Sequence, residues 1–102
     1  MRFAIDFDGT FAADPELFRT LIAAIHARGH DCVLVTGRSD TPPWGDEVRA
    51  LVGALLPVVF AGGDWKRNAA RRAGLAIDVW IDDHPEYVAP QDPDVLAARG
   101  IA

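Results

Sequence analysis

The chain has 102 residues, of which half are apolar and a quarter are charged, and its net charge is −5. This length suits one domain with one core and excludes two, and the mixture excludes a disordered or fibrous protein. The acidic balance argues against a general nucleic-acid binder. The longest weakly polar stretch, residues 50–63, is interrupted by Gly53 and Pro57, so no membrane partner is expected.

The first half of the chain is predicted to form a strand, a helix and a second strand. Asp14 and Pro15 are a typical helix start, and Gly29 is a typical helix end. The apolar residues of this helix recur at helical spacing and predict one buried face. These residues are Phe18, Leu21, Ile22 and Ile25. The strands on either side of the helix are predicted at residues 2–7 and 32–35, and a loop is predicted at residues 36–43.

The second half repeats the pattern. Asp46 and Glu47 are expected to open a second helix, Pro57 to end it, and Asp64 to cap a third helix that runs to about Ala73. The second helix would bury Val48, Leu51, Val52 and Leu55. Strands are predicted at residues 58–60 and 76–81, and a last helix from Asp92 or Asp94 through Arg99 would precede a strand stub at residues 100–102.

Strands that alternate with helices predict an α/β fold with a parallel sheet. In such sheets, ligands bind at the carboxyl ends of the strands. Unusual polar residues follow all four predicted strands in this chain. They are Asp6-Phe7-Asp8-Gly9-Thr10 after the first, Thr36-Gly37-Arg38 after the second, Lys66 beyond the third and Asp82-Asp83 after the fourth.

The carboxylates at these strand ends predict a metal site. If the first and fourth strands are neighbours, Asp6, Asp8, Asp82 and Asp83 lie together and face at most Lys66 and Arg38. Carboxylates that close cannot all stay ionised unaided, and Mg²⁺ prefers such oxygen ligands together with a substrate phosphate. Lys66 is also the only lysine beside nine arginines, which indicates a specific role.

The remaining parts suit a phosphoryl group. Thr36 offers a hydroxyl, Lys66 an ammonium, and the backbone around Gly9 and Gly37 offers N–H groups, so these four residues are the predicted phosphate-binding set. A carboxylate at the end of the first strand can act as a nucleophile, and a second one two residues later can act as acid and base.

These four motifs, in this order and over residues 3–85, resemble those of the haloacid dehalogenase superfamily in its phosphatase branch. The resemblance implies a three-layer Rossmannoid fold with strand order 3-2-1-4. The short connections after Thr10 and before Lys66 leave no room for a cap domain, so residues 1–102 would form one capless domain. A small open site is also compatible with a homo-oligomer.

The resemblance assigns a role to each motif residue. Asp6 would attack phosphorus, and Asp8 would protonate the leaving oxygen and then activate water. Thr36 and Lys66 would bind the phosphoryl group and complete the catalytic set. The Mg²⁺ ligands would be Asp6, the Asp8 main-chain carbonyl, Asp82 and Asp83. The substrate would be phosphorylated, either a small molecule or a macromolecular end.

Four further residues are possible substrate contacts, each with an ordinary alternative. Arg38 would contact phosphate or pair with Asp40. Trp44 and Trp65, expected in loops near the site, would stack on a substrate ring or pack at the rim. His84 would contact substrate or form a local hydrogen bond in a turn.

Two other functions stay open on the sequence. One is a phosphatase that trims polynucleotide ends, and the other is a non-catalytic binding or regulatory module on the same scaffold. A phospho-receiver domain is excluded, because its phosphorylated Asp ends the third strand, where this chain has Phe60-Ala61-Gly62. A single cysteine, Cys32, excludes an internal disulfide and a cysteine-based zinc site, and no secretory leader is recognised, so a cytoplasmic protein is expected.

Overall fold

A four-stranded parallel sheet forms the centre of the molecule. The computed structural model describes residues 1–89. The strand order is β3-β2-β1-β4, and all three neighbouring pairs are parallel, which confirms the predicted α/β class and strand order. The predicted last helix from Asp92 or Asp94 and the stub at residues 100–102 lie outside the described residues. The strands are β1 (Arg2–Ile5), β2 (Asp31–Thr36), β3 (Val58–Phe60) and β4 (Val79–Ile81).

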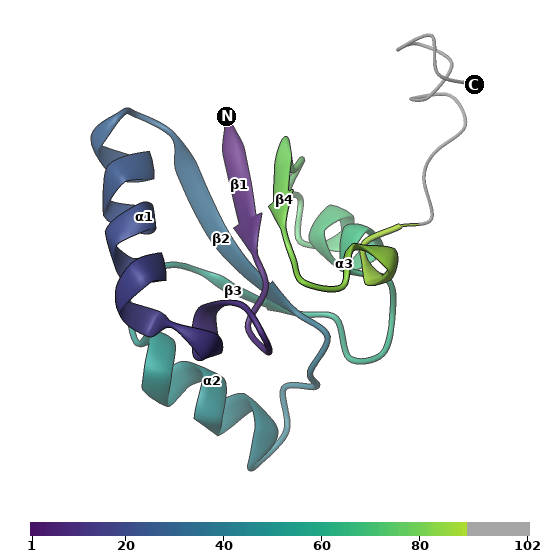
Figure 1. The fold of residues 1–102 in the computed structure, drawn as a ribbon. Coiled ribbons are helices and arrows are strands. Elements are labelled where there is room, and N and C mark those ends of the chain that lie inside the picture. The colour runs from purple at the N-terminus through teal and green to yellow at the C-terminus, as the bar shows by residue number, and fades with distance from the viewer. Residues whose placement is uncertain (90–102) are drawn as a thin grey trace, which may run out of the picture.

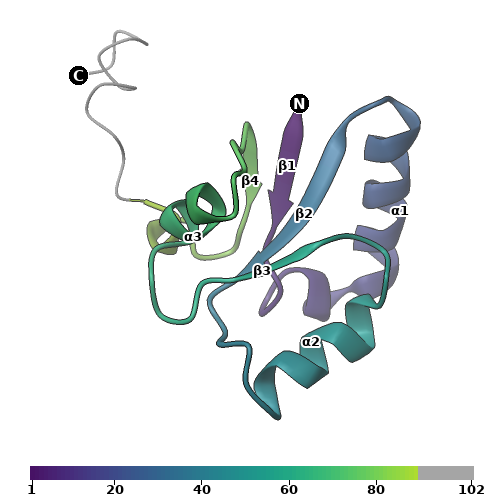
Figure 2. The same cartoon turned by 180° about the vertical axis from the view of Figure 1, so that it is seen from behind.

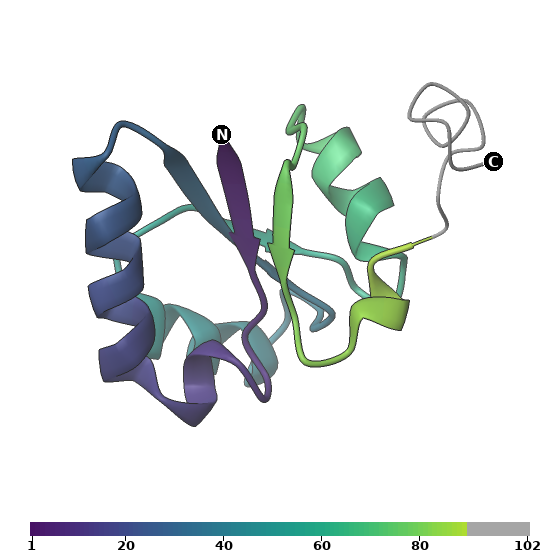
Figure 3. The ribbon, with the colours of Figure 1, turned by 45° about the horizontal axis from the view of Figure 1, so that its top comes forward.

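Helices cover both faces of the sheet and make three layers. Helices α1 and α2 lie on one face and α3 lies on the other, as Figures 1 and 3 show. No helix within residues 1–89 has the length and apolar character needed to cross a membrane. The helices are α1 (Pro15–Ala27), α2 (Trp44–Val52) and α3 (Lys66–Arg72), with short 3₁₀ turns η1 (Phe11–Ala13) and η2 (Pro85–Tyr87).

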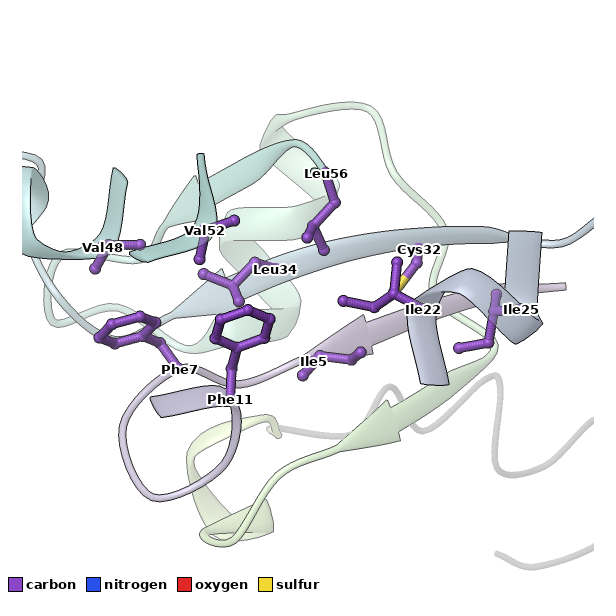
Figure 4. Packing of buried hydrophobic residues seen from close by; sticks show 10 residues of the cluster. All are labelled: Ile5, Phe7, Phe11, Ile22, Ile25, Cys32, Leu34, Val48, Val52 and Leu56. Atoms are coloured by element: carbon purple, nitrogen blue, oxygen red, sulfur yellow. The ribbon is translucent and has the colours of Figure 1, made fainter. Parts of the chain in front are cut away.

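The core follows from the alternation of side chains along the buried strands. On the face of α1 and α2, ten side chains meet in one cluster, drawn in Figure 4. On the other face, Ala4, Val33 and Val35 form a smaller cluster against which Trp80 packs. The larger cluster consists of Ile5, Phe7, Phe11, Ile22, Ile25, Cys32, Leu34, Val48, Val52 and Leu56.

Helix α1 confirms its sequence prediction. Asp14 is the N-cap, and its Oδ1 accepts a hydrogen bond of 3.1 Å from the Leu17 main-chain N–H. Gly29 follows the helix with a φ of 81°, a conformation that glycine adopts without strain. Ile22 and Ile25 are buried, and Phe18 and Leu21 pack partly buried against the same cluster.

Helix α2 differs from its prediction at both ends. It begins at Trp44, two residues before the predicted opening at Asp46, and Asp46 and Glu47 lie within its first turn. It ends at Val52, because Gly53 adopts a φ of 60° that ends the helix well before Pro57. Leu55 therefore falls beyond the helix and is 37% exposed, which makes its predicted place on the core face wrong.

Four further boundaries also differ. Strand β1 stops at Ile5 because the chain turns at once, and the Phe11 N–H bonds to the Asp6 carbonyl at 3.1 Å. Thr36 belongs to β2 rather than to a loop. Strand β4 begins at Val79 and not at residue 76, because β1, its only neighbour within residues 1–89, pairs with it from Phe3 onward. The N-cap of α3 is Trp65 and not Asp64.

Candidate metal and phosphoryl site

Most of the predicted chemical residues line one cavity of about 580 Å³. The carboxyl ends of β1, β2 and β4 point to the same side of the sheet, where α3 begins (Figures 1 and 2). This is the place where ligands bind in open parallel sheets. The lining residues are Asp6, Asp8, Gly37, Arg38, Gly63, Asp64, Trp65, Lys66, Asp82, His84 and Tyr87.

Lys66 joins two buried carboxylates at the floor of the cavity. Its Nζ donates to Asp6 Oδ1 at 2.6 Å and to Asp82 Oδ2 at 2.5 Å. The side chains of Lys66 and Asp6 are each 5% exposed, and that of Asp82 is 2% exposed. Buried charges need partners, and each of the three has one here. Lys66 is the first residue of α3, so the turn after β3 brings it to the end of β1.

Asp83 extends this cluster toward solvent. The buried Thr10 hydroxyl lies 3.2 Å from Asp6 Oδ2 and 3.2 Å from Asp83 Oδ1. A hydroxyl carries one proton and can fully satisfy only one of two carboxylate acceptors. One of the two oxygens, Asp6 Oδ2 or Asp83 Oδ1, therefore receives no full hydrogen bond from Thr10. A cation or an additional proton between the two carboxylates would stabilise them.

The donor set fits a hard divalent cation. Carboxylate oxygens of Asp6, Asp82 and Asp83 all lie within 4.8 Å of one another. Mg²⁺ binds oxygens at about 2.0–2.1 Å, so opposite ligands of one ion lie roughly 4 Å apart. Three carboxylates against the single ammonium of Lys66 also leave an excess of negative charge that a divalent ion would balance. A carboxylate oxygen that accepts one hydrogen bond keeps a second lone pair, so Asp6, Asp82 and Asp83 can each still offer a ligand atom.

The protonation of the cluster shows the same excess of negative charge. Burial raises the pKa of Asp6 to about 6, and the hydrogen bond from Lys66 offsets only part of this effect. An interaction with Asp6 lowers the pKa of Asp83, so of these two carboxyls Asp6 takes up a proton first as the pH falls. Burial lowers the pKa of Lys66, but its bonds to Asp6 and Asp82 outweigh burial and leave the pKa above its usual value.

The raised pKa of Asp6 predicts a pH-dependent stability in the absence of metal. The carboxyl titrates near 4 when unfolded and at about 6 when folded, so its contribution is complete below pH 4 and is lost as the pH rises through 6. In urea unfolding with EDTA, the free energy of unfolding of the wild type should fall by roughly 3 kcal/mol relative to that of Asp6→Asn as the pH rises from 4 to above 6. Parallel pH profiles for the two proteins would contradict the assignment.

Asp8 lies apart from the cluster, contrary to the predicted crowding of four carboxylates. Arg38 holds it with two hydrogen bonds, from Nε to Oδ2 at 2.9 Å and from Nη2 to Oδ1 at 2.8 Å. Arg38 also donates from Nη1 to Glu47 Oε2 at 2.5 Å, which ties the loop after β2 to α2. The predicted alternative of an Arg38–Asp40 pair is wrong, because Asp40 pairs with Arg49 at 2.6 Å.

The predicted phosphate-binding residues divide into two groups. Lys66 and Gly37 line the cavity, whereas Thr36 and Gly9 do not. Thr36 is fully buried at the end of β2, and its Oγ1 accepts the Arg38 main-chain N–H at 3.3 Å. Within residues 1–89 the structure therefore gives Thr36 a role in shaping the loop that carries Gly37 and Arg38.

Gly9 is required by the packing of the cluster. Its φ is 77°, and a Cβ at this position would lie 2.2 Å from Asp83 Oδ2. Gly9→Ala should therefore displace Asp83 and weaken Mg²⁺ binding by about 10- to 100-fold, measured by calorimetric titration. Gly29→Ala is the matched control, because Gly29 has a φ of 81° and open space around its Cβ position. Equal Mg²⁺ affinities for the two variants would rule out this packing role.

The weaker predictions have mixed outcomes. Trp65 lines the cavity and is 44% exposed. Trp44 is the first residue of α2 and not a loop residue, and its side chain does not line the cavity. His84 lines the cavity and also forms the predicted local bonds, with its N–H 2.9 Å from Asp82 Oδ1 and its Nδ1 2.9 Å from Glu86 Oε1.

Sequence reasoning missed three residues of the site. Thr10 lies in the first motif, and its hydroxyl contacts Asp6 and Asp83. A hydroxyl residue so close in sequence to Asp6 and Asp8 was a signal that could have identified it. Glu47 was interpreted as a helix-start acid and not as a partner of Arg38. Tyr87 lines the cavity from η2, and no sequence pattern distinguishes it from a surface tyrosine.

Comparison of the chain with models of known families, with curated proteins and with solved structures finds no match. The chemistry of the cavity stands on its own side chains. Asp6 offers a carboxylate oxygen beside an ammonium, a carboxylate cluster can hold a divalent cation, and the pair of Asp8 and Arg38 lies at the same opening. Such an arrangement can bind a phosphoryl group and attack it.

Proposed function

We propose that the protein is a Mg²⁺-dependent phosphatase of the haloacid dehalogenase type that forms an aspartyl-phosphate on Asp6. The observation that carries the proposal is the position of Asp6 at the end of β1. Its carboxylate is buried against Lys66, lines a cavity and shares a candidate cation site with Asp82 and Asp83. A carboxylate that serves as a nucleophile toward phosphorus needs this charge compensation.

Asp6, Asp83, the Asp8 main-chain carbonyl and, directly or through water, Asp82 would hold the ion. When bound, Mg²⁺ would offset the negative charge of the carboxylates and of the phosphoryl group. The raised pKa of Asp6 supports this requirement, because the nucleophile must be ionised near neutral pH.

In the first step, a carboxylate oxygen of Asp6 attacks phosphorus, and the bond from phosphorus to the leaving oxygen breaks. Lys66 Nζ lies 2.6 Å from Asp6 Oδ1 and would orient the nucleophile. Its positive charge would stabilise the negative charge of the phosphoryl group. In the second step, water attacks the same phosphorus and releases inorganic phosphate. The Asp6 carboxylate is thereby regenerated.

Asp8 is the proposed acid and base of these steps. It would give its proton to the leaving oxygen and then take one from the attacking water. In the structure both Asp8 oxygens accept hydrogen bonds from the Arg38 guanidinium, so neither oxygen is free to carry a proton while these bonds last. The two bonds to Arg38 must therefore open for Asp8 to act as an acid, and Arg38 is a positioning residue for it.

The connections around the cavity support a capless enzyme. Only η1 separates the first motif from α1, and a short turn joins β3 to α3. No inserted domain covers the cavity within residues 1–89. The whole chain of 102 residues is accordingly proposed to be a single domain with an open site.

The test is hydrolysis of p-nitrophenyl phosphate with Mg²⁺ and with EDTA. We expect turnover that EDTA abolishes and added Mg²⁺ restores. Turnover that persists unchanged in EDTA would refute the metal requirement. No turnover, together with no Mg²⁺ binding by calorimetry, would favour the non-catalytic module instead.

A further inference from the structure

The mouth of the cavity carries two exposed aromatic side chains. Six large apolar side chains are exposed within residues 1–89, and two of them, Trp65 and Tyr87, line this cavity. Trp65 is 44% exposed and Tyr87 is 56% exposed. Large aromatic surfaces left in water beside a charged floor are typical of ligand sites, because binding removes them from water.

The two aromatic residues are held in a fixed relation to each other and to the floor. The Arg67 N–H bonds to the Val88 carbonyl at 3.1 Å, which ties the start of α3 to the end of η2. Trp65 directly precedes Lys66, whose Nζ contacts the nucleophile. A phosphoryl group at Lys66 would therefore lie in the same cavity that the two aromatic side chains line.

We propose that the substrates are nucleoside monophosphates, with the phosphate on the floor and the base against Trp65 and Tyr87. This inference rests on the proposed phosphatase function. Every base offers a flat π-face, and stacking on an aromatic side chain stabilises it. A cavity of about 580 Å³ lies in the usual range of roughly 300–1,000 Å³ for small-molecule sites.

Charge favours a small nucleotide over a polynucleotide end. The chain carries a net charge of −5, which repels a long phosphate backbone. Two cations line the cavity, Lys66 and Arg38, and both form ion pairs with carboxylates. Together they can bind one phosphate group, which suits a mononucleotide. His84, whose ring lies 5.4 Å from that of Tyr87, completes an aromatic wall on this side of the opening.

The test compares adenosine 5′-monophosphate with ribose 5-phosphate, which has the same phosphate and sugar but no base. We expect kcat/KM with Mg²⁺ to be about 10-fold higher for the nucleotide. Trp65→Ala and Tyr87→Ala should each bring this ratio toward one, whereas Trp65→Phe should retain it. The matched control is Trp44→Ala, because Trp44 is 56% exposed but lies outside the cavity lining, and it should leave the ratio unchanged.

The outcomes separate the two proposals. Equal hydrolysis of both compounds would overturn the stacking site and leave the phosphatase standing. A second outcome is that the protein hydrolyses neither compound but binds the nucleotide in calorimetry, and that Trp65→Ala removes this binding. This outcome would overturn the phosphatase and leave the stacking site standing. A preference of more than about 10-fold for a 3′-phosphorylated oligonucleotide over the mononucleotide would overturn the substrate class in favour of polynucleotide ends.

Discussion

Asp6→Asn should abolish phosphatase turnover, lowering kcat by at least about 10⁴-fold, as loss of a nucleophile does in other covalent enzymes. The amide keeps the shape of the side chain but cannot form the bond to phosphorus. The fold should persist, because Lys66 keeps its bond of 2.5 Å to Asp82 and the β1 backbone is unchanged. Steady-state hydrolysis of p-nitrophenyl phosphate and far-ultraviolet circular dichroism measure the two effects.

A second aspartate serves as the control for this variant. Asp46 is exposed in the first turn of α2 and is not part of the cavity lining, so Asp46→Asn should keep full turnover. A folded Asp6→Asn protein with more than about one tenth of the wild-type kcat would overturn the role of Asp6, since a lost nucleophile leaves far less.

Lys66→Met should have the largest effect on stability of any single change at the site. It leaves Asp6 and Asp82 buried without their shared ammonium, and removing one partner of a buried ion pair typically costs about 3–5 kcal/mol. Turnover should fall together with stability, because the same ammonium orients the nucleophile. Urea unfolding in EDTA and the kinetic assay measure the two losses.

The pH dependence separates this effect from a simple packing defect. Loss of Lys66 removes a bond that lowers the pKa of Asp6, so the cost of the variant should grow as the pH rises through 6 and the carboxyls ionise. Arg49→Met is the control, because its pair with Asp40 is about half exposed and a solvent-exposed ion pair contributes little to stability. A pH-independent cost for Lys66→Met would contradict the account.

The positions of the chemical residues could be predicted because parallel strands end on the same edge of a sheet. Asp6, Gly37, Lys66 and Asp82 all reach the cavity for this reason, and each was found from its place after a predicted strand or at a helix start. The strand order was also predicted, through the resemblance of the motifs.

What could not be predicted depends on distances between side chains of different segments. Arg38 reaches Asp8 and Glu47 rather than its near neighbour Asp40, because the loop after β2 turns its guanidinium toward the end of β1. Leu55 fits the helical spacing, but Gly53 ends the helix before it. Tyr87 comes to the cavity through the turn of η2, which no periodicity reveals.

The Asp8–Arg38 pair would add a step to the proposed mechanism that sequence alone did not suggest. Both Asp8 oxygens accept hydrogen bonds from the guanidinium, so Asp8 would have to leave Arg38 before it could act as the acid. The side chain of Asp8 is 58% exposed, so its release requires no rearrangement of the core. Substrate phosphate can replace Asp8 as the partner of Arg38, which would couple binding to the freeing of the acid.

The central claim is that the Asp6 carboxylate bonds to phosphorus, and beryllium fluoride tests it without knowledge of the substrate. Beryllium fluoride binds an aspartate oxygen as a mimic of an aspartyl-phosphate. Fluorine-19 spectra should show a bound signal in the wild type that requires Mg²⁺ and that is missing in Asp6→Asn. A bound signal of equal strength in Asp6→Asn, or none in the Mg²⁺-loaded wild type, would contradict the claim.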